Sequence, residues 1–436
     1  MATAEHSPSV DTVERSTPRA ATVSLTTFAM VASALLIYVS QAFLASEILG
    51  IKRELQAILI IPIALAACHY IVSQPRRLVD PLIFFSMVKL GTELALRGQW
   101  SYILDSLASA FALLVLACAP ARSFEISVKF LVRFAGILAL MALVQWVMLI
   151  HDPTLSKSVI EVSDDGAMLN TIENPIALLA LHGDPDYTLL GHPVVRMQSF
   201  AKEPSLNVLY FVLPACLAFL RNSRSTRLWG SIMLAYSIFS LSGSVFLSLG
   251  FSGIWWVLLR VSSIKFAVPW GMLIFMAVFL FAVEYFGLEP IMDAFTYIAQ
   301  YGDYLNKGAS LTDRTGGAVL NMGAALASPF GSPTLSDIPG PWLINSALAA
   351  GWLGVLCLIW FLSKLGRQLD TYYRNSRALS GRTLGSLLLL GAVAMVVVFN
   401  DYQMGNYSGL ILLAFIYRTI EMRNERDQAV HRRVSS

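Results

Sequence analysis

The stretch LTTFAMVASALLIYVSQAFLA, residues 25–45, decides the fold class of this chain, because it contains no Asp, Glu, Lys or Arg. As an α-helix it reaches about 32 Å, at about 1.5 Å per residue. That length matches the hydrocarbon core of a bilayer, which is about 30 Å thick. The run is too long for a signal-peptide core and ends without a clear cleavage site, so we interpret it as an uncleaved first membrane span.

Apolar runs of this kind recur along the whole chain. Of the 436 residues, 56% are hydrophobic and 14% are charged, a balance typical of a chain whose main solvent is lipid. We therefore predict an all-α, polytopic integral membrane protein with about twelve transmembrane helices. The candidate spans are 25–45, 55–73, 78–96, 101–119, 129–150, 205–220, 228–241, 245–259, 267–287, 342–363, 383–399 and 407–418. We expect residues 1–24 to be a disordered cytoplasmic tail, 25–418 one transmembrane domain and 419–436 a second cytoplasmic tail.

The distribution of basic residues predicts the orientation of these spans. With the N-terminus in the cytoplasm, 21 of the 31 Lys and Arg residues fall on the cytoplasmic side, as the positive-inside rule requires. Both termini are then cytoplasmic. The run from Leu228 to Leu259 is either one helix or a hairpin of two, and as one helix it would reach about 48 Å, well beyond the hydrocarbon core. Because Arg227 and Arg260 flank it, we favour the hairpin, with eleven spans as the alternative.

The composition argues against two classes of partner. The formal net charge is only +3 and the basic residues are dispersed, so the stripe that a nucleic acid requires is absent from the sequence. The cysteines lie singly inside apolar runs, and His182 and His192 match no strong ligand spacing, so we expect neither a metal site nor a disulfide frame. We predict no cofactor.

Two predicted outside loops, 151–204 and 288–341, are far longer than the others, and long loops carry function more often than short ones. The first ends in HPVVRMQSFAKEPS, residues 192–205, directly before a predicted span. Arg196, Lys202 and Glu203 are therefore expected at the membrane surface, where a lipid head group would lie. The alternative is ordinary helix-start chemistry, because an acidic residue such as Glu203 near a helix N-terminus complements the helix dipole.

The second long loop contains DRTGG, residues 313–317, then an apolar stretch over 318–327 and SPFGSP, residues 328–333. An arginine such as Arg314 beside the paired glycines Gly316 and Gly317 can approach a phosphate closely, since guanidinium binds it bidentately and glycine lets backbone amides come near. The alternative is that Asp313 caps a turn in which Arg314 is solvated.

Together these motifs resemble a known family. An Arg shortly before a Phe-x-x-Glu-Pro-Ser helix start, followed by Asp-Arg, an apolar helix and Pro-Phe-Gly-Ser, is similar to the Wzy-type bacterial polysaccharide polymerases, within the O-antigen polymerase and ligase superfamily. The matching region runs from about residue 190 to 355. The resemblance implies a metal-independent glycosyltransferase with a GT-C-like fold in the bacterial inner membrane, whose two long loops are periplasmic.

The implied reaction joins undecaprenyl-diphosphate-linked oligosaccharide repeat units into exopolysaccharide, capsule or O-antigen, and a chain-length regulator protein is an implied partner. By the resemblance, Arg196 and Arg314 hold the diphosphate of the donor, and Lys202 adds to the same positive field. Glu203 is the candidate general base, or otherwise an orienting partner for Arg196. Asp313 is expected to position Arg314. His192, Gly316 and Gly317 complete the expected substrate-binding set.

Two other functions stay open. Ligases of this superfamily carry a catalytic His before the span after the second long loop, whereas this chain has no His between His192 and His431, which favours a polymerase. A polytopic transporter or lipid-linked oligosaccharide flippase would instead depend on charges inside the spans, namely Lys89, Glu93 or Glu284. Lys89 and Glu93 are four residues apart, so the simplest expectation for them is a local ion pair.

Overall fold

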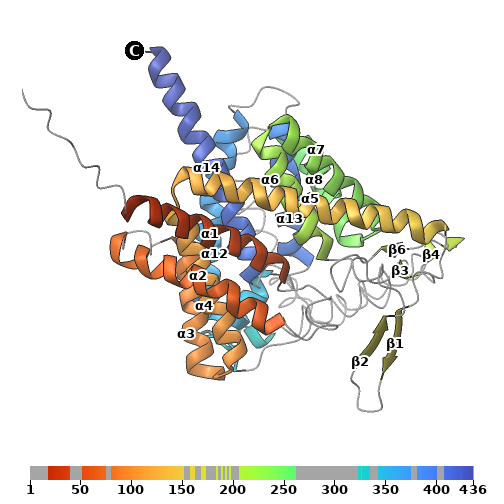
Figure 1. The fold of residues 1–436 in the computed structure, drawn as a ribbon, viewed down its shortest axis with the longest axis horizontal. Helices are drawn as coiled ribbons and strands as arrows, with labels where there is room; N and C mark the ends of the chain where they lie inside the picture. Colours follow the sequence, from red (N-terminus) through yellow and green to blue (C-terminus); the bar gives the residue numbers. More distant parts are fainter. Residues whose placement is uncertain are drawn as a thin grey trace, which may run out of the picture.

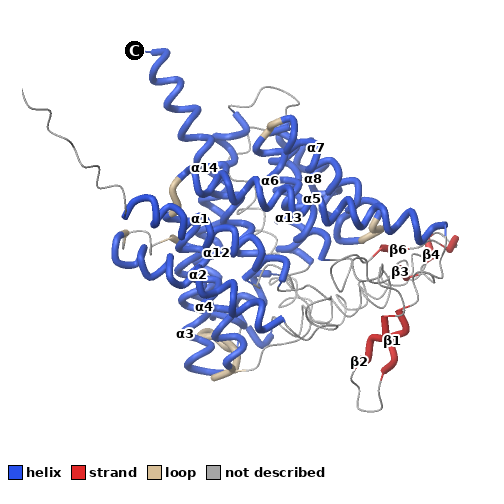
Figure 2. Tube along the Cα trace, viewed as in Figure 1, coloured by secondary structure: helices blue, strands red, loops and turns tan. Residues whose placement is uncertain are grey.

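The computed structural model is a bundle of long helices with a small set of strands (Figures 1 and 2). It describes residues 18–39, 52–74, 80–151, 158–162, 168–172, 183–184, 188–189, 192–193, 196–197, 206–261, 323–325, 327–333, 342–374, 381–399 and 407–435.

The helices follow the apolar runs of the sequence. In chain order they are α1 (Pro18–Val39), α2 (Lys52–Ser73), α3 (Pro81–Thr92), the π-helix η3 (Glu93–Arg97), α4 (Trp100–Cys118), α5 (Ala121–His151), the π-helix η7 (Val208–Val212), α6 (Leu213–Arg221), α7 (Arg224–Phe239), α8 (Gly243–Val261), α12 (Trp342–Arg374), α13 (Gly381–Phe399) and α14 (Tyr407–Ser435). In the described residues, every predicted span overlaps one or two of these helices, and the span 267–287 lies outside the described residues.

Within the described part of the chain, three helical stretches are long and apolar enough to cross a membrane: Arg53–Ser73, Ala121–Met148 and Trp342–Tyr373. Several other apolar helices are shorter. The helical, membrane-compatible architecture thus agrees with the prediction, and the count of twelve crossings stays a prediction.

Contacts between parallel helices fix the relative directions of α1, α5 and α7. Thr27 Oγ1 lies 2.9 Å from Ser123 Oγ, and the rings of Tyr38 and Phe134 are 5.1 Å apart, so α1 and α5 run in the same direction. α7 runs parallel to α5 as well, because Trp229 packs on Gly136 and, further along both helices, Phe239 packs on Trp146.

Other contacts define antiparallel neighbours. Lys364 lies 3.4 Å from Asp80 at the start of α3, whereas Leu348, earlier in α12, contacts Arg97 at the end of η3. α3 and α12 therefore run in opposite directions. These relations agree with the alternation that the predicted topology requires.

The bundle consequently has two distinct ends. At one end, which we call the basic end, Arg221, Arg423 and Arg426 lie together. At the opposite end, which we call the loop end, α5 finishes at His151 and α12 begins at Trp342. Both predicted long loops border the loop end, since the first follows α5 and the second precedes α12.

The stretch from Leu228 to Leu259 is a pair of helices and not one. α7 ends at Phe239, and α8 begins at Gly243 after a turn in which Leu241 has a left-handed φ of 50°. α7 packs on α5 and α6, while α8 packs on α13. The prediction of two helices across this stretch is confirmed.

The centre of the bundle is η7 with α6, whose residues from Leu206 to Leu220 are all buried. Pro214 has no N–H with which to bond the Tyr210 carbonyl one turn earlier, and the local backbone is a π-helix. The hydroxyl of Tyr38 donates to that Tyr210 carbonyl at 3.1 Å. A hydrogen bond from α1 therefore compensates for the proline in the central helix.

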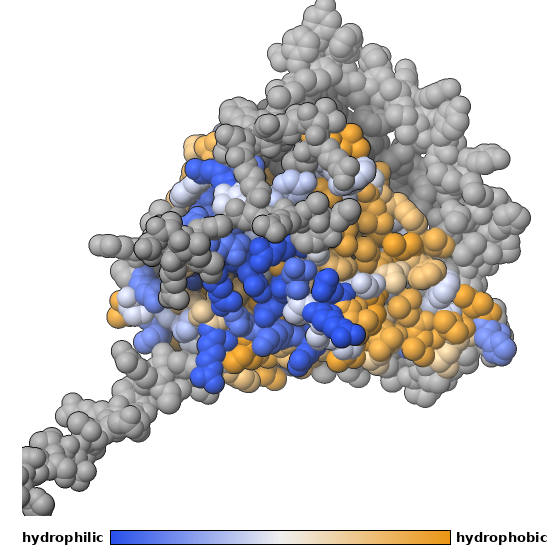
Figure 3. All heavy atoms as spheres, turned by 90° about the horizontal axis from the view of Figure 1, so that it is seen from above, coloured by the Kyte–Doolittle hydropathy of each residue, from blue (hydrophilic) through white to orange (hydrophobic). Residues whose placement is uncertain are grey.

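The outside of the bundle carries many exposed apolar side chains. They include Ile58, Ile61, Leu65, Phe84, Met87, Ile137, Leu140, Val147, Ile254, Val257, Leu353 and Leu356. Figure 3 shows a broad hydrophobic surface beside a hydrophilic area. An apolar exterior of this extent is what contact with lipid tails requires.

Three features differ from the sequence predictions. The first long loop contains three short antiparallel strand pairs: β1 (Ser158–Val162) with β2 (Met168–Ile172), β3 (Gly183–Asp184) with β6 (Arg196–Met197), and β4 (Thr188–Leu189) with β5 (His192–Pro193). β1 and β2 are rich in β-branched residues, which favour strands.

The tails differ too. α1 begins at Pro18, inside the predicted disordered tail, because proline is well suited to the first helical turn. At the other end of the chain, α14 continues as helix through the predicted C-terminal tail to Ser435.

Candidate functional site

The structure places two of the predicted site residues on a nested hairpin. β6 pairs with β3, so Arg196 stands opposite Asp184, and between them His192 of β5 stands opposite Leu189 of β4. The backbone of both candidates is thus held in one antiparallel arrangement, which follows β1 and β2 in the chain.

The other predicted site residues lie outside the described residues. They are Lys202, Glu203, Asp313, Arg314, Gly316 and Gly317. Whether the guanidinium groups of Arg196 and Arg314 meet therefore stays a prediction.

The second motif is described where it reaches the bundle, at Ser328–Ser332. Gly331 N–H donates to the Ser328 carbonyl at 3.0 Å, which closes a turn. This turn then exchanges two backbone hydrogen bonds with α12: Ser332 N–H donates to Leu348 at 2.8 Å, and Trp352 N–H donates to Pro329 at 3.0 Å. In a continuous helix Trp352 would instead bond Leu348.

α12 is broken at Gly351 to make this exchange. Gly351 has φ 65° and ψ −176°, which is non-helical, and a Cβ on it would lie 2.6 Å from the Pro329 carbonyl oxygen. Gly331 has φ 102°, and a Cβ there would lie 2.7 Å from Thr92 Cγ2. Both positions need glycine for conformation and for close approach. The Pro-Phe-Gly-Ser motif and the α12 kink are therefore one fitted unit, which we call the motif junction.

Arg97 fastens the motif junction to the rest of the bundle. Its Nε donates to the Ser332 carbonyl at 2.9 Å, and its Nη2 donates to the Leu348 carbonyl at 2.7 Å. Its Nη1 pairs with the carboxylate of Glu93, one turn earlier in η3. The Arg97 and Glu93 side chains are 2% and 0% exposed. One guanidinium thus joins a carboxylate, the turn and the broken helix.

The sequence interpretation did not identify Arg97. It expected Glu93 to pair with Lys89, four residues before it. The structure shows that Arg97, four residues after it, pairs with this carboxylate. Both spacings are equal in the sequence, so only the position of the motif junction distinguishes them. The other carboxylate oxygen, Oε2 of Glu93, is buried and makes no hydrogen bond to the described residues.

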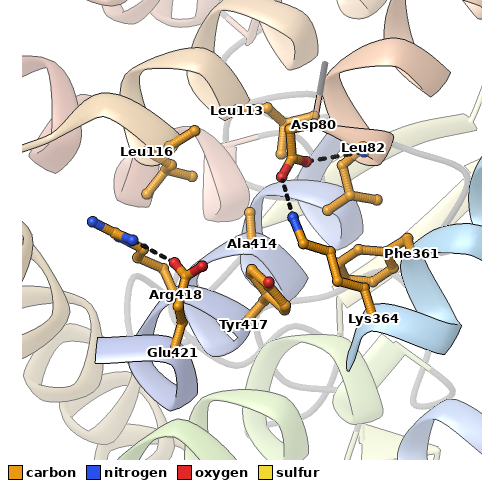
Figure 4. A pocket seen from close by; sticks show the side chains of 11 residues that line it. Asp80, Leu82, Leu113, Leu116, Phe361, Lys364, Ala414, Tyr417, Arg418 and Glu421 are labelled. Atoms are coloured by element: carbon orange, nitrogen blue, oxygen red, sulfur yellow. Dashed lines mark hydrogen bonds and ion pairs between the residues drawn. The ribbon is translucent and has the colours of Figure 1, made fainter. Parts of the chain in front are cut away.

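A second polar site lies at the far end of the α3 and α12 pair, about 25 Å from the motif junction by helix length. Its pocket is lined by Asp80, Lys364, Tyr417, Arg418 and Glu421 among apolar residues, with a volume of about 440 Å³ that includes its open mouth (Figure 4). It joins the start of α3 to α12 and α14.

The charges of this second site compensate one another. Asp80 accepts a hydrogen bond from Leu82 N–H at 3.1 Å, which caps α3, and it pairs with Lys364. Arg418 pairs with Glu421 one turn later on α14. Since the cations and carboxylates balance, we interpret this pocket as a polar contact between helices.

Within the described ranges, no group of three or more His, Cys, Asp and Glu side chains has the arrangement of a metal site. No family model matches the chain, and searches of curated proteins and of solved structures give no match.

Proposed function

We propose that this chain is a GT-C-like membrane glycosyltransferase that polymerises undecaprenyl-diphosphate-linked oligosaccharide repeat units at the periplasmic face of the inner membrane. The observation that carries the proposal is the pair of motifs around Arg196 and Arg314, with Phe200 to Ser205 and Pro329 to Ser332 beside them.

Two features of the bundle support the proposal. The chain leaves α5 and enters α12 at the same end of the bundle, which is compatible with a substrate site shared by the two long loops. The motif junction also holds Pro329 to Ser332 with backbone hydrogen bonds and with Arg97, so the chain shortly after Arg314 has a fixed anchor. Rigid supports of this kind hold the residues of a catalytic loop in the geometry that the reaction needs.

In the proposed reaction, an acceptor hydroxyl oxygen attacks the anomeric carbon of the donor glycan and forms the new glycosidic bond. The bond from that carbon to the diphosphate breaks, and its electron pair leaves with the diphosphate. Arg196 and Arg314, with Lys202, stabilise the negative charge that accumulates there. Glu203 accepts the proton of the acceptor hydroxyl, or else orients Arg196.

Deletion of the protein tests the proposal directly, because single lipid-linked repeat units should then accumulate outside the cytoplasm. Arg196→Glu and Arg314→Glu should each abolish polymer while the protein stays in the membrane. Arg367→Glu, at an exposed arginine on the half of α12 nearer the basic end, is the matched control and should leave the polymer unchanged. Normal polymer with both Arg196 and Arg314 reversed would refute this site.

One observation favours a second candidate, a lipid-linked oligosaccharide flippase or other transporter. Glu93 is fully buried, and one of its oxygens makes no hydrogen bond within the described part of the chain; buried carboxylates of this kind occur in transport pathways. A flippase should tolerate Arg314→Glu but lose activity in Glu93→Gln. In that case lipid-linked units would accumulate on the cytoplasmic side of the membrane instead of outside it.

A further inference from the structure

Another pocket, separate from the motif junction and from the pocket around Asp80, lies at the basic end between α5, α6 and α14. Its polar lining consists of Glu125, Arg221, Arg423 and Arg426, and its volume is about 280 Å³, including the open mouth. We call it the basic pocket. Phe124, Thr419 and Met422 complete its walls.

The basic pocket holds more positive charge than its own carboxylate neutralises. Arg426 pairs with Glu125. Arg221 makes a long contact of 3.4 Å from Nη1 to the Glu125 carbonyl, and Arg423 Nη2 donates to the Arg221 carbonyl at 3.2 Å. Arginine stays charged in proteins, so three guanidinium groups face one carboxylate. Lys129 lies near Glu125 and adds to the same positive field.

Helix ends bring these like charges together. Arg221 is the last residue of α6, and Arg423 and Arg426 lie one turn apart on α14. The cost of placing like charges near each other is relieved by a bound anion. Guanidinium binds phosphate through paired hydrogen bonds, so a phosphate group is the anion that this geometry suits best.

The surroundings of the basic pocket distinguish between sources of phosphate. Ile126, next to Glu125 on α5, is 44% exposed, and Leu228 on α7 is 61% exposed. Exposed apolar surface therefore begins next to the pocket at Ile126. Figure 3 shows that hydrophobic and hydrophilic areas adjoin on one face of the molecule. A phospholipid can use both surfaces at once, with its phosphate in the pocket and its chains along the helices, whereas a soluble anion uses only the first.

We propose that the basic pocket binds the phosphate of an anionic phospholipid head group. Basic pockets between transmembrane helices are known to bind such head groups. The Glu125 carboxylate competes with the lipid phosphate for Arg426, because it already forms an ion pair with that guanidinium.

Lipid binding to the purified full-length protein in detergent tests this proposal. Phosphatidylglycerol should bind, and raise the midpoint of thermal unfolding, more than phosphatidylcholine does. Arg423→Gln and Arg221→Gln should each weaken phosphatidylglycerol binding about fivefold. Arg423→Lys should retain most of it, and Arg367→Gln, whose side chain lies outside the pocket, should bind as the unchanged protein does.

Glu125→Gln gives the decisive result, because the proposal predicts tighter phosphatidylglycerol binding when the competitor is removed. A purely structural Glu125–Arg426 pair predicts no gain. Equal binding of both lipids, equal loss in Arg367→Gln, or full competition by millimolar inorganic phosphate would overturn the proposal. None of these measurements depends on polymer synthesis.

Discussion

Arg97 and Leu348 are joined by a hydrogen bond of 2.7 Å from the Arg97 guanidinium to the Leu348 carbonyl, although 251 positions separate them in the chain. The same carbonyl accepts the N–H of Ser332. The break in α12 leaves the Leu348 carbonyl without its helical partner, and this oxygen accepts hydrogen bonds from Arg97 of η3 and from Ser332 of the motif instead. The stability of this contact is open to direct measurement.

Arg97→Gln should be among the most destabilising single changes in the bundle. It leaves the Glu93 carboxylate buried without its cation, and breaking a buried ion pair in this way costs about 3–5 kcal/mol. The midpoint of thermal unfolding in detergent should fall accordingly. The double variant Glu93→Gln with Arg97→Gln should recover part of the loss, since no unpaired charge remains. If the double variant is less stable than Arg97→Gln, the burial argument is wrong.

Gly351→Ala should destabilise the motif junction. The change places a side chain in left-handed backbone and drives its Cβ toward the Pro329 carbonyl, at a cost of about 1–3 kcal/mol. Gly253→Ala is the matched control, because Gly253 lies within α8 with no atom within 4 Å of an added Cβ. The control should change stability by about 1 kcal/mol or less, in the stabilising direction. Equal unfolding midpoints for the two variants would contradict the assigned kink.

Tyr38→Phe should cost about 1 kcal/mol, because it removes the hydrogen bond to the Tyr210 carbonyl. The change is more informative in combination with Pro214→Ala, which supplies a backbone N–H one turn after Tyr210. In that background the helix can satisfy its own carbonyl, so Tyr38→Phe should cost less. Additive effects in this double-mutant cycle would show that the proline and the tyrosine are independent.

Asp80 has two separable roles that substitution can distinguish. Asp80→Ala removes the cap of α3 and should cost about 1 kcal/mol. Asp80→Asn keeps a capping oxygen and removes only the charge facing Lys364, a partly exposed pair worth about 1 kcal/mol or less. The Asn variant should differ least from the unchanged protein at high salt, where exposed pairs are screened. Unfolding midpoints measured at low and high salt provide the comparison.

Apolar run length was sufficient to predict most helix positions. The predicted spans, as far as the structure describes them, overlap helices, because lipid imposes a length and a polarity on every span. Arg227 and Arg260 also indicated the turn between α7 and α8, since basic flanks on both sides require a return.

Two features depended on information that no single run contains. Glu93 has a basic residue four positions away on each side, and its choice of Arg97 depends on where Ser332 and Leu348 lie in space. The strands of the first long loop are short, and run length cannot detect them. The Asp165-Gly166 dipeptide between β1 and β2 is a hairpin signal that was available in the sequence.

The break at Gly351 also divides α12 into two unequal arms. The turn at Ser328–Ser332 bonds both arms: Ser332 N–H donates to the Leu348 carbonyl on the short arm, and Trp352 N–H on the long arm donates to the Pro329 carbonyl. The turn therefore bridges the broken helix, and any bending of the short arm against the long one has to break at least one of these hydrogen bonds.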